Sequence, residues 1–175
     1  MKSLNEYQQQ AMSTAIFPVD RSLDYTVLGL LSEVGELAEA WLDNKKTLHD
    51  VAAEAGDCYW YCAAIADTLE VSLEDVVRFS MGGRMYLATT NIIHALTASS
   101  GNLAGLVKKA IRDDGGHFSP ERREKAIDLL GKTVLHLDEL CEGLGTTRWA
   151  VMNANLDKLL SRKARGVLGG SGDAR

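Results

Sequence analysis

The apolar residues of this chain recur at the spacing of an α-helix almost from end to end. One such stripe, with steps of three or four residues, consists of Leu23, Val27, Leu30, Val34 and Leu37. No sustained alternation of apolar and polar residues, which would mark a half-buried strand, occurs in the sequence. The chain is therefore predicted to be all-α.

Capping signals divide the chain into separate helices. Thr47 with Asp50, and Ser72 with Asp75, have the spacing of a capping box, in which two residues satisfy free backbone N–H groups at a helix start. Together with the apolar periodicity, these signals predict helices over about 4–15, 22–44, 47–69, from 72 onward, 91–112, 120–142 and 146–165. The glycine-rich end, 169–175, cannot hold a helix unaided, so it either dangles or is ordered by a ligand.

Part of the sequence is repeated. A first group, Gly35, Leu37 and Ala38, recurs 66 positions later as Gly101, Leu103 and Ala104. A second group, Gly56, Leu69 and Val76, recurs 75 positions later as Gly131, Leu144 and Val151. The additional positions fall at the segment DDGGHFSP, a suitable place for a surface insertion. The sequence therefore predicts two tandem helical repeats, 1–90 and 91–175.

Composition limits the partners and the compartment. The formal net charge is −5, which argues against nucleic acid as the main partner, because such binding needs a basic face. The N-terminus has no apolar segment of a secretory signal, and the longest uncharged stretch, Met85–Val107, is too polar for a membrane span. Three cysteines fit a reducing compartment or simple core packing. A cytoplasmic protein without a membrane anchor is expected.

Two acidic pairs stand out on neighbouring predicted helices. Glu33 and Glu36 are three residues apart, as are Glu54 and Asp57, so each pair shares a helix face. Such pairs are common on solvated surfaces. Here, however, Glu54 falls within an apolar stripe, and an antiparallel hairpin of the two helices would bring four carboxylates into a partly dry place. A compensating cation is therefore expected.

The residue types favour a particular cation. Neither helix places lysine or arginine on these faces, and four carboxylates offer hard oxygen ligands, which suit Mg²⁺ or Mn²⁺ better than zinc. A di-iron bundle is the alternative, but it would use Glu-x-x-His pairs, and neither pair ends in histidine.

The arrangement Glu33-x-x-Glu36, seventeen residues, then Glu54-x-x-Asp57 resembles the signature of the all-α nucleoside triphosphate pyrophosphohydrolases. This superfamily includes MazG, dimeric dUTPases and phosphoribosyl-ATP pyrophosphohydrolase. The segments LNEYQQQAMSTA, LGLLSEVGELAE and NANLDKLLSRKARGVLGGSGDAR are similar to small phage-type MazG-like proteins. The resemblance spans nearly the whole chain and implies tandem MazG-like repeats packed as a pseudo-dimeric helix bundle.

The two repeats depart from the family pattern in complementary ways. The second copy has Ser99, Asn102, Leu129 and Lys132 where the first has its four acids. Conversely, the family-like tail residues Asn155, Lys158 and Arg162 correspond to Ser80, Gly83 and Leu87 in the first copy. The resemblance thus implies one composite site, with metal on the first repeat and phosphate contacts from Asn155, Lys158 and Arg162. The structural alternative for these three is a solvated basic helix face.

The resemblance also implies a reaction. A (d)NTP and water would give a (d)NMP and pyrophosphate, with Mg²⁺, or Mn²⁺ in its place, held by Glu33, Glu36, Glu54 and Asp57. One of these carboxylates would also accept the proton of the attacking water, and Glu39 is a candidate outer ligand or base, unless it is merely solvated.

The base that such an enzyme would prefer is less defined. Trp60 and Tyr61 lie nearest the acids and are the candidates for stacking on it, although aromatic residues more often belong to the core. A purine such as dGTP is one candidate substrate. A dUTPase or dCTPase that cleans the nucleotide pool and a non-catalytic helical interaction protein are the alternatives. The expected partners are a nucleotide and, in a homodimer, a second chain; the expected location is the cytoplasm, that of a host cell if the protein is viral.

Overall fold

The computed structural model describes residues 3–80 and 88–169. Within this part of the chain, all regular structure is helical. The elements are α1 (Leu4–Met12), a 3₁₀ turn η1 (Val19–Arg21), α2 (Ser22–Leu42), α3 (Leu48–Thr68), α4 (Leu73–Phe79), α5 (Thr89–Asp114), α6 (Pro120–Gly143) and α7 (Arg148–Ala164). The all-α prediction is confirmed.

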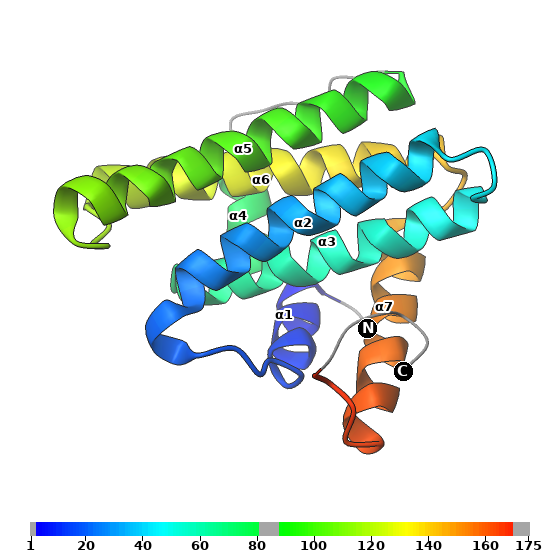
Figure 1. Cartoon of the computed structure of the whole chain (residues 1–175), viewed down its shortest axis with the longest axis horizontal. Helices are drawn as coiled ribbons and strands as arrows, with labels where there is room; N and C mark the ends of the chain where they lie inside the picture. The colour runs from blue at the N-terminus through cyan, green and yellow to red at the C-terminus, as the bar shows by residue number, and fades with distance from the viewer. Residues whose placement is uncertain (1–2, 81–87, 170–175) are drawn as a thin grey trace.

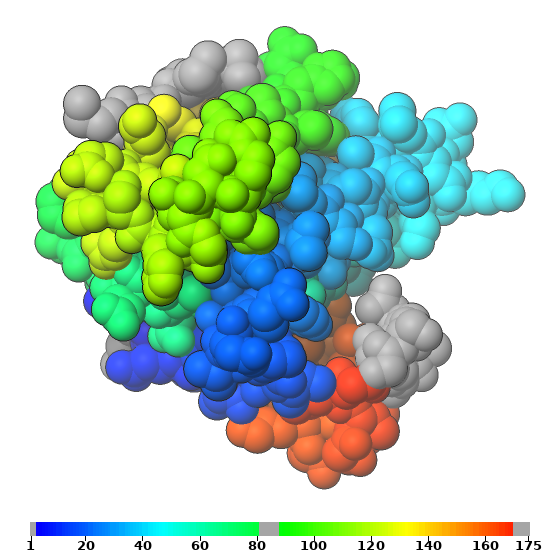
Figure 2. Space-filling view, turned by 60° about the vertical axis from the view of Figure 1, so that its left-hand side comes forward, coloured from blue at the N-terminus to red at the C-terminus, as the bar shows by residue number. Residues whose placement is uncertain are grey.

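Two long antiparallel hairpins dominate the molecule. Helices α2 and α3 form the first hairpin and α5 and α6 form the second, which lies above the first in Figure 1. The hairpins meet mainly through α2 and α5, and Figure 2 shows the green α5 lying directly against the blue α2 on one face. Helix α7 packs on α3, and α4 packs on α6, so each hairpin is covered by the short helix that follows the other.

Local capping fixes where the helices begin. The Thr47 amide donates to the Asp50 carboxylate at 2.7 Å, and the Asp50 amide donates to Thr47 Oγ1 at 3.2 Å, which completes the capping box of α3. Ser72 Oγ accepts from the Asp75 amide at 3.0 Å and caps α4. The predicted helices are thus present, and their ends lie within three residues of the predicted ones. Helix α1 stops at Met12, where Ser13 Oγ donates to the carbonyl of Gln10 at 2.7 Å.

Two glycines allow the short helices to approach the hairpins closely. An added Cβ on Gly56 of α3 would lie 3.0 Å from Cβ of Asn155 and 3.5 Å from a methyl group of Val151, both on α7. An added Cβ on Gly131 of α6 would lie 2.7 Å from both the carbonyl oxygen of Val76 and Cβ of Ser80. Each helix therefore lies against a backbone position that has no side chain.

One hydrophobic core runs through both hairpins and includes the buried, free thiols of Cys58, Cys62 and Cys141. The expected division at residue 90 falls in the first turn of α5. Gly83, Leu87 and the end of the glycine-rich tail, which also entered the predictions, lie outside the described residues. Among the helices that the structure describes, none combines the length and the apolar character needed to cross a membrane.

Candidate metal and nucleotide site

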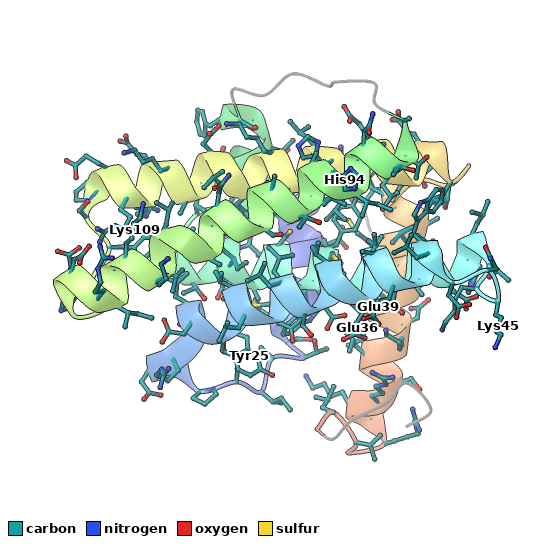
Figure 3. All side chains as sticks on the ribbon, turned by 45° about the horizontal axis from the view of Figure 1, so that its top comes forward. Tyr25, Glu36, Glu39, Lys45, His94 and Lys109 are labelled. Carbon is teal, nitrogen blue, oxygen red and sulfur yellow. The ribbon has the colours of Figure 1, made fainter. Side chains whose placement is uncertain are left out.

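Three of the four predicted acids meet between α2 and α3. Glu33 and Glu36 lie on α2 and Glu54 on α3, and each offers a carboxylate oxygen within 4.8 Å of the other two. Glu36 is exposed, whereas Glu33 and Glu54 are half-buried, so the cluster opens toward solvent on one side. Figure 3 labels Glu36 along the stretch of α2 that overlaps α7 in that view. The hairpin thus brings together three hard oxygen donors from two helices.

Asp57, the fourth predicted acid, is held by the second half of the chain. Asn155 Nδ2 donates to Asp57 Oδ1 at 2.7 Å, and Lys158 Nζ lies 2.6 Å from Asp57 Oδ2. Only 20% of the Asp57 side chain and 28% of the Lys158 side chain are exposed, so solvent weakens this ion pair less than one on the open surface. A lysine therefore neutralises one of the four acids directly. This lysine lies on α7, so the sequences of α2 and α3 did not predict the pairing.

The electrostatics of the cluster are unfavourable for anions. Burial, followed by the neighbouring charges of Asp57, Glu36 and Glu54, raises the pKa of Glu33 to about 8, although Lys158 acts in the opposite direction. A carboxyl group with this pKa holds its proton near neutrality. A divalent cation would relieve the same repulsion.

Helix α7 carries the predicted tail residues. Asn155 is 4% exposed and Arg162 is 5% exposed, so neither lies on a solvated face. Lys158 lies between them in the sequence, on the side of the helix that faces Asp57. The close approach at Gly56 is what allows Val151 and Asn155 of α7 to reach α3. Asn155 and Lys158, from the second half of the chain, thus meet Asp57 of the first half.

The aromatic residues next to the acids have different surroundings. Trp60 Nε1 donates to Thr14 Oγ1 at 2.9 Å and to the carbonyl of Ala11 at 3.2 Å, which ties α3 to the end of α1. The Tyr61 ring lies over Gly29, where an added Cβ would come within 2.1 Å of it. Burial raises the pKa of Tyr61, and the neighbouring Tyr25 adds to the shift. Trp60 thus has a structural role, and its contact with a base stays a prediction, whereas Tyr61 packs on α2 at Gly29.

Phe17 and Tyr25 extend this aromatic group. Their rings stack with centroids 5.5 Å apart, and Phe17 meets Trp60 edge-on at 6.2 Å. Tyr25 is 45% exposed and is labelled in Figure 3 on the N-terminal part of α2. The sequence interpretation did not single out Tyr25, although its position eight residues before Glu33 and four before Gly29 places it on the same helix face.

An apolar cavity lies on another side of the acids. Its volume is about 350 Å³, and its walls come from α3, α7 and the loop before α7, including His49, Ala53 and Ala154 beside Asn155 and Lys158.

Glu39, the candidate outer ligand, is exposed. Figure 3 shows it close to Glu36 on α2.

The fold and these contacts define a class of protein. It is an all-α bundle with a carboxylate cluster on one helical hairpin and a lysine, Lys158, that reaches the neighbouring Asp57 from a helix of the other half. Comparison with known proteins agrees with this class. Residues 21–81 match the MazG nucleotide pyrophosphohydrolase domain. The Gene 37 protein of Mycobacterium phage L5 is 39% identical over 80 residues, which are 46% of this chain and 70% of the phage protein. No solved structure matches the chain.

The chain belongs to the MazG nucleotide pyrophosphohydrolase family. The matched region contains all of α2, α3 and α4, and therefore Glu33, Glu36, Glu54 and Asp57. Helices α5, α6 and α7 lie beyond it, so Asn155 and Lys158, which contact Asp57, come from outside the matched region.

Proposed function

We propose that this protein is a metal-dependent nucleotide pyrophosphohydrolase that converts a (d)NTP and water into a (d)NMP and pyrophosphate. The observation that carries the proposal is the meeting of Glu33, Glu36 and Glu54 within 4.8 Å, next to the Asp57–Lys158 pair. Triphosphate cleavage needs neutralisation of negative charge and a positioned water, and this combination of acidic and basic groups suits both needs.

The residues present fit a divalent metal ion. All donors in the cluster are carboxylate oxygens, which Mg²⁺ and Mn²⁺ prefer, and the raised pKa of Glu33 reflects a repulsion that a cation would remove. Glu33, Glu36 and Glu54 would hold the ion, with Asp57 as the fourth ligand when Lys158 releases it. When bound, the metal would polarise the phosphate and lower the pKa of a coordinated water.

The remaining tasks fall to other side chains. A carboxylate that does not hold the ion would accept the proton of the attacking water, and the exposed Glu39, close to Glu36 on α2, is the candidate. Lys158 and Arg162 contact the phosphates, and Asn155 orients Asp57 through its 2.7 Å hydrogen bond.

For the base we favour the aromatic group over the apolar cavity. Phe17, Tyr25 and Tyr61 offer rings on the same side of α2 as the acids, and stacking accepts a flat base, whereas the cavity has mostly small aliphatic walls. Tyr25→Ala should raise KM for the nucleotide with little change in kcat, while Trp149→Ala, an exposed aromatic on α7, serves as the control. If filling the cavity by Ala154→Leu raised KM instead, the base would belong there.

We further propose that 1–90 and 91–175 are tandem repeats that form this composite site. The reciprocal packing of α7 on α3 and of α4 on α6, and the equivalent close approaches at Gly56 and Gly131, support the proposal. Arg162→Ala should then reduce turnover nearly as much as Glu36→Gln. An Arg162→Ala variant with unchanged folding and full turnover would contradict the composite site.

The decisive experiment is a panel of ribo- and deoxynucleoside triphosphates with Mg²⁺ or Mn²⁺, assayed for pyrophosphate and monophosphate. We expect release of pyrophosphate, and a purine such as dGTP is our first candidate. A preference for dUTP or dCTP would indicate a pool-cleaning enzyme instead. Metal plus nucleotide should also raise Tm by mass action, whereas a non-catalytic interaction protein would show neither effect.

The proposed place of action is the cytoplasm, where the nucleotide pool is found. A homodimer of this chain is a further proposal, which sedimentation of the purified protein would test directly.

A further inference from the structure

The same face of the two hairpins carries opposite charge. In the first hairpin seven carboxylates follow one another at helical spacing on α2, at the residue that ends it, and on α3: Glu33, Glu36, Glu39, Asp43, Asp50, Glu54 and Asp57. At the repeat offsets of 66 and 75, the residues on α5 and α6 are Ser99, Asn102, Gly105, Lys109, Lys125, Leu129 and Lys132. Every acid is thus replaced by a neutral residue or by a lysine.

A cavity marks this face of the second hairpin. Its volume is about 330 Å³, within the range of pockets that hold small ligands. Its walls include Asn102, Gly105 and Lys109 from α5, and Lys125, Asp128 and Leu129 from α6. Leu106 of α5 completes the walls, and five of the seven lining residues stand where the first hairpin has an acid.

The charge within the cavity is positive. Its one carboxylate, Asp128, pairs with Lys132 at 2.6 Å, so the two charges offset each other. Neither Lys109 nor Lys125 forms an ion pair with any residue that the structure describes. Each has an acid one turn away on its own helix. Asp113, near Lys109, is bound by Arg112 at 2.6 Å, and Glu121, near Lys125, is hydrogen-bonded to Ser119 at the start of α6. Two exposed ammonium groups therefore face the cavity.

We propose that this basic cavity binds the polyphosphate chain of a small anion without a metal ion. Lysine acts as a point charge for phosphate, and the Asn102 amide can donate a further hydrogen bond to a phosphate oxygen. The volume fits a di- or triphosphate rather than an extended strand, and the net charge of −5 disfavours wide contact with nucleic acid. The cavity is separate from the carboxylate cluster: Figure 3 shows Lys109 near the far end of α5, away from Glu36 on α2.

The test is calorimetric titration of the whole protein with tripolyphosphate in excess EDTA, so that no divalent ion participates. We expect saturable binding that Lys109→Met combined with Lys125→Met weakens at least about 10-fold. The matched control is Lys45→Met combined with Lys46→Met, which removes two exposed lysines from the turn of the acidic hairpin and should leave binding unchanged. Because all four positions are exposed, folding should be retained, which circular dichroism checks.

Several outcomes would overturn the proposal. No binding in EDTA, or equal binding by the double variant, would show that the cavity does not take polyphosphate. Loss of binding in Lys158→Met instead would place the anion at α7. Tighter binding of a single-stranded oligonucleotide than of tripolyphosphate would identify nucleic acid as the ligand. Parallel titrations with pyrophosphate and with a dNTP distinguish an inorganic source from a nucleotide, and the result does not depend on whether the protein hydrolyses nucleotides.

Discussion

The α2–α3 and α5–α6 hairpins share a pattern of packing but differ in chemistry. Both are covered by a short helix that lies against a glycine, Gly56 in the first hairpin and Gly131 in the second. The first has Glu33, Glu36 and Glu54 gathered within 4.8 Å, whereas at the equivalent place in the second Thr133 Oγ1 donates to Ser99 Oγ at 3.0 Å. Two hairpins can therefore share a pattern of packing while their charged faces differ, because packing and charge depend on different sides of the helices.

The largest expected effect tests whether the acids act only in the first hairpin. Glu36→Gln should lower pyrophosphohydrolase turnover on the order of 1000-fold, about 4 kcal/mol in activation free energy, because a charged ligand is lost while the volume is kept. Asn102→Gln, the equivalent position in the second hairpin, should leave turnover within about 2-fold. Steady-state kinetics with Mg²⁺ provide the measurement. Equal losses of turnover in both variants would show that the two hairpins do not differ in their contribution to catalysis.

The second effect tests the packing that the hairpins share. Gly131→Ala should reduce the free energy of unfolding by about 2 kcal/mol, because the new methyl group meets the carbonyl oxygen of Val76 at 2.7 Å and α4 must move. Gly56→Ala should cost less, since its shortest contact is 3.0 Å, to Cβ of Asn155, and alanine favours a helix over glycine by about 1 kcal/mol. Urea denaturation measures both variants, and the reverse order would contradict the packing at these two glycines.

The third effect tests the link between the halves. Lys158→Met should lower turnover about 10-fold, about 1.4 kcal/mol, because Asp57 loses the ammonium group 2.6 Å away and the phosphates lose a contact. Lys132→Met removes an ion pair of the same length within the second hairpin and should not affect turnover. A Lys158→Met enzyme with wild-type kinetics would show that α7 only packs against α3.

The smallest effect concerns pH and tests the difference in charge between Glu33 of the first hairpin and the neutral Ser99 of the second. Glu33 has a pKa raised from 4.5 to about 8, so between these values the folded protein keeps a proton that the unfolded chain releases. In EDTA, stability from this group should therefore fall as pH rises from about 5 to 8, by about 1 kcal/mol once solvent screening is considered. Thermal melts should show a decrease of about 2–4 °C that Glu33→Gln removes. Ser99, the equivalent residue of the second hairpin, has no charge to titrate. A Tm that rises over this pH range would refute the raised pKa of Glu33.

The sequence was sufficient to predict the helices and the meeting of three acids. The Thr47–Asp50 capping box, the cap at Ser72 and the apolar stripes all predicted elements that are present, because capping and amphipathicity are local properties. The pairs at three-residue spacing also predicted that Glu33, Glu36 and Glu54 would share a region, since a short turn between two helices leaves little choice but an antiparallel hairpin.

Other features of the site depend on contacts between residues far apart in the chain. The hydrogen bond of Trp60 to Thr14 and the approach of Tyr61 to Gly29 follow from how α1, α2 and α3 pack, which no local pattern encodes. Lys158, the cationic partner of Asp57, lies 101 residues away in the sequence. The residues of α2 and α3 therefore could not predict this ion pair.

The amino-acid sequence by itself determined an all-α chain, the positions of its caps and the two acidic pairs, because helix formation and face composition depend on neighbours within a few residues. Only the tertiary structure decided that Asn155 and Lys158 hold Asp57, and that Lys109 and Lys125 face one cavity. These contacts arise when helices pack over glycine positions and bring distant charges together, and the energy of a charge depends on the groups that surround it in space.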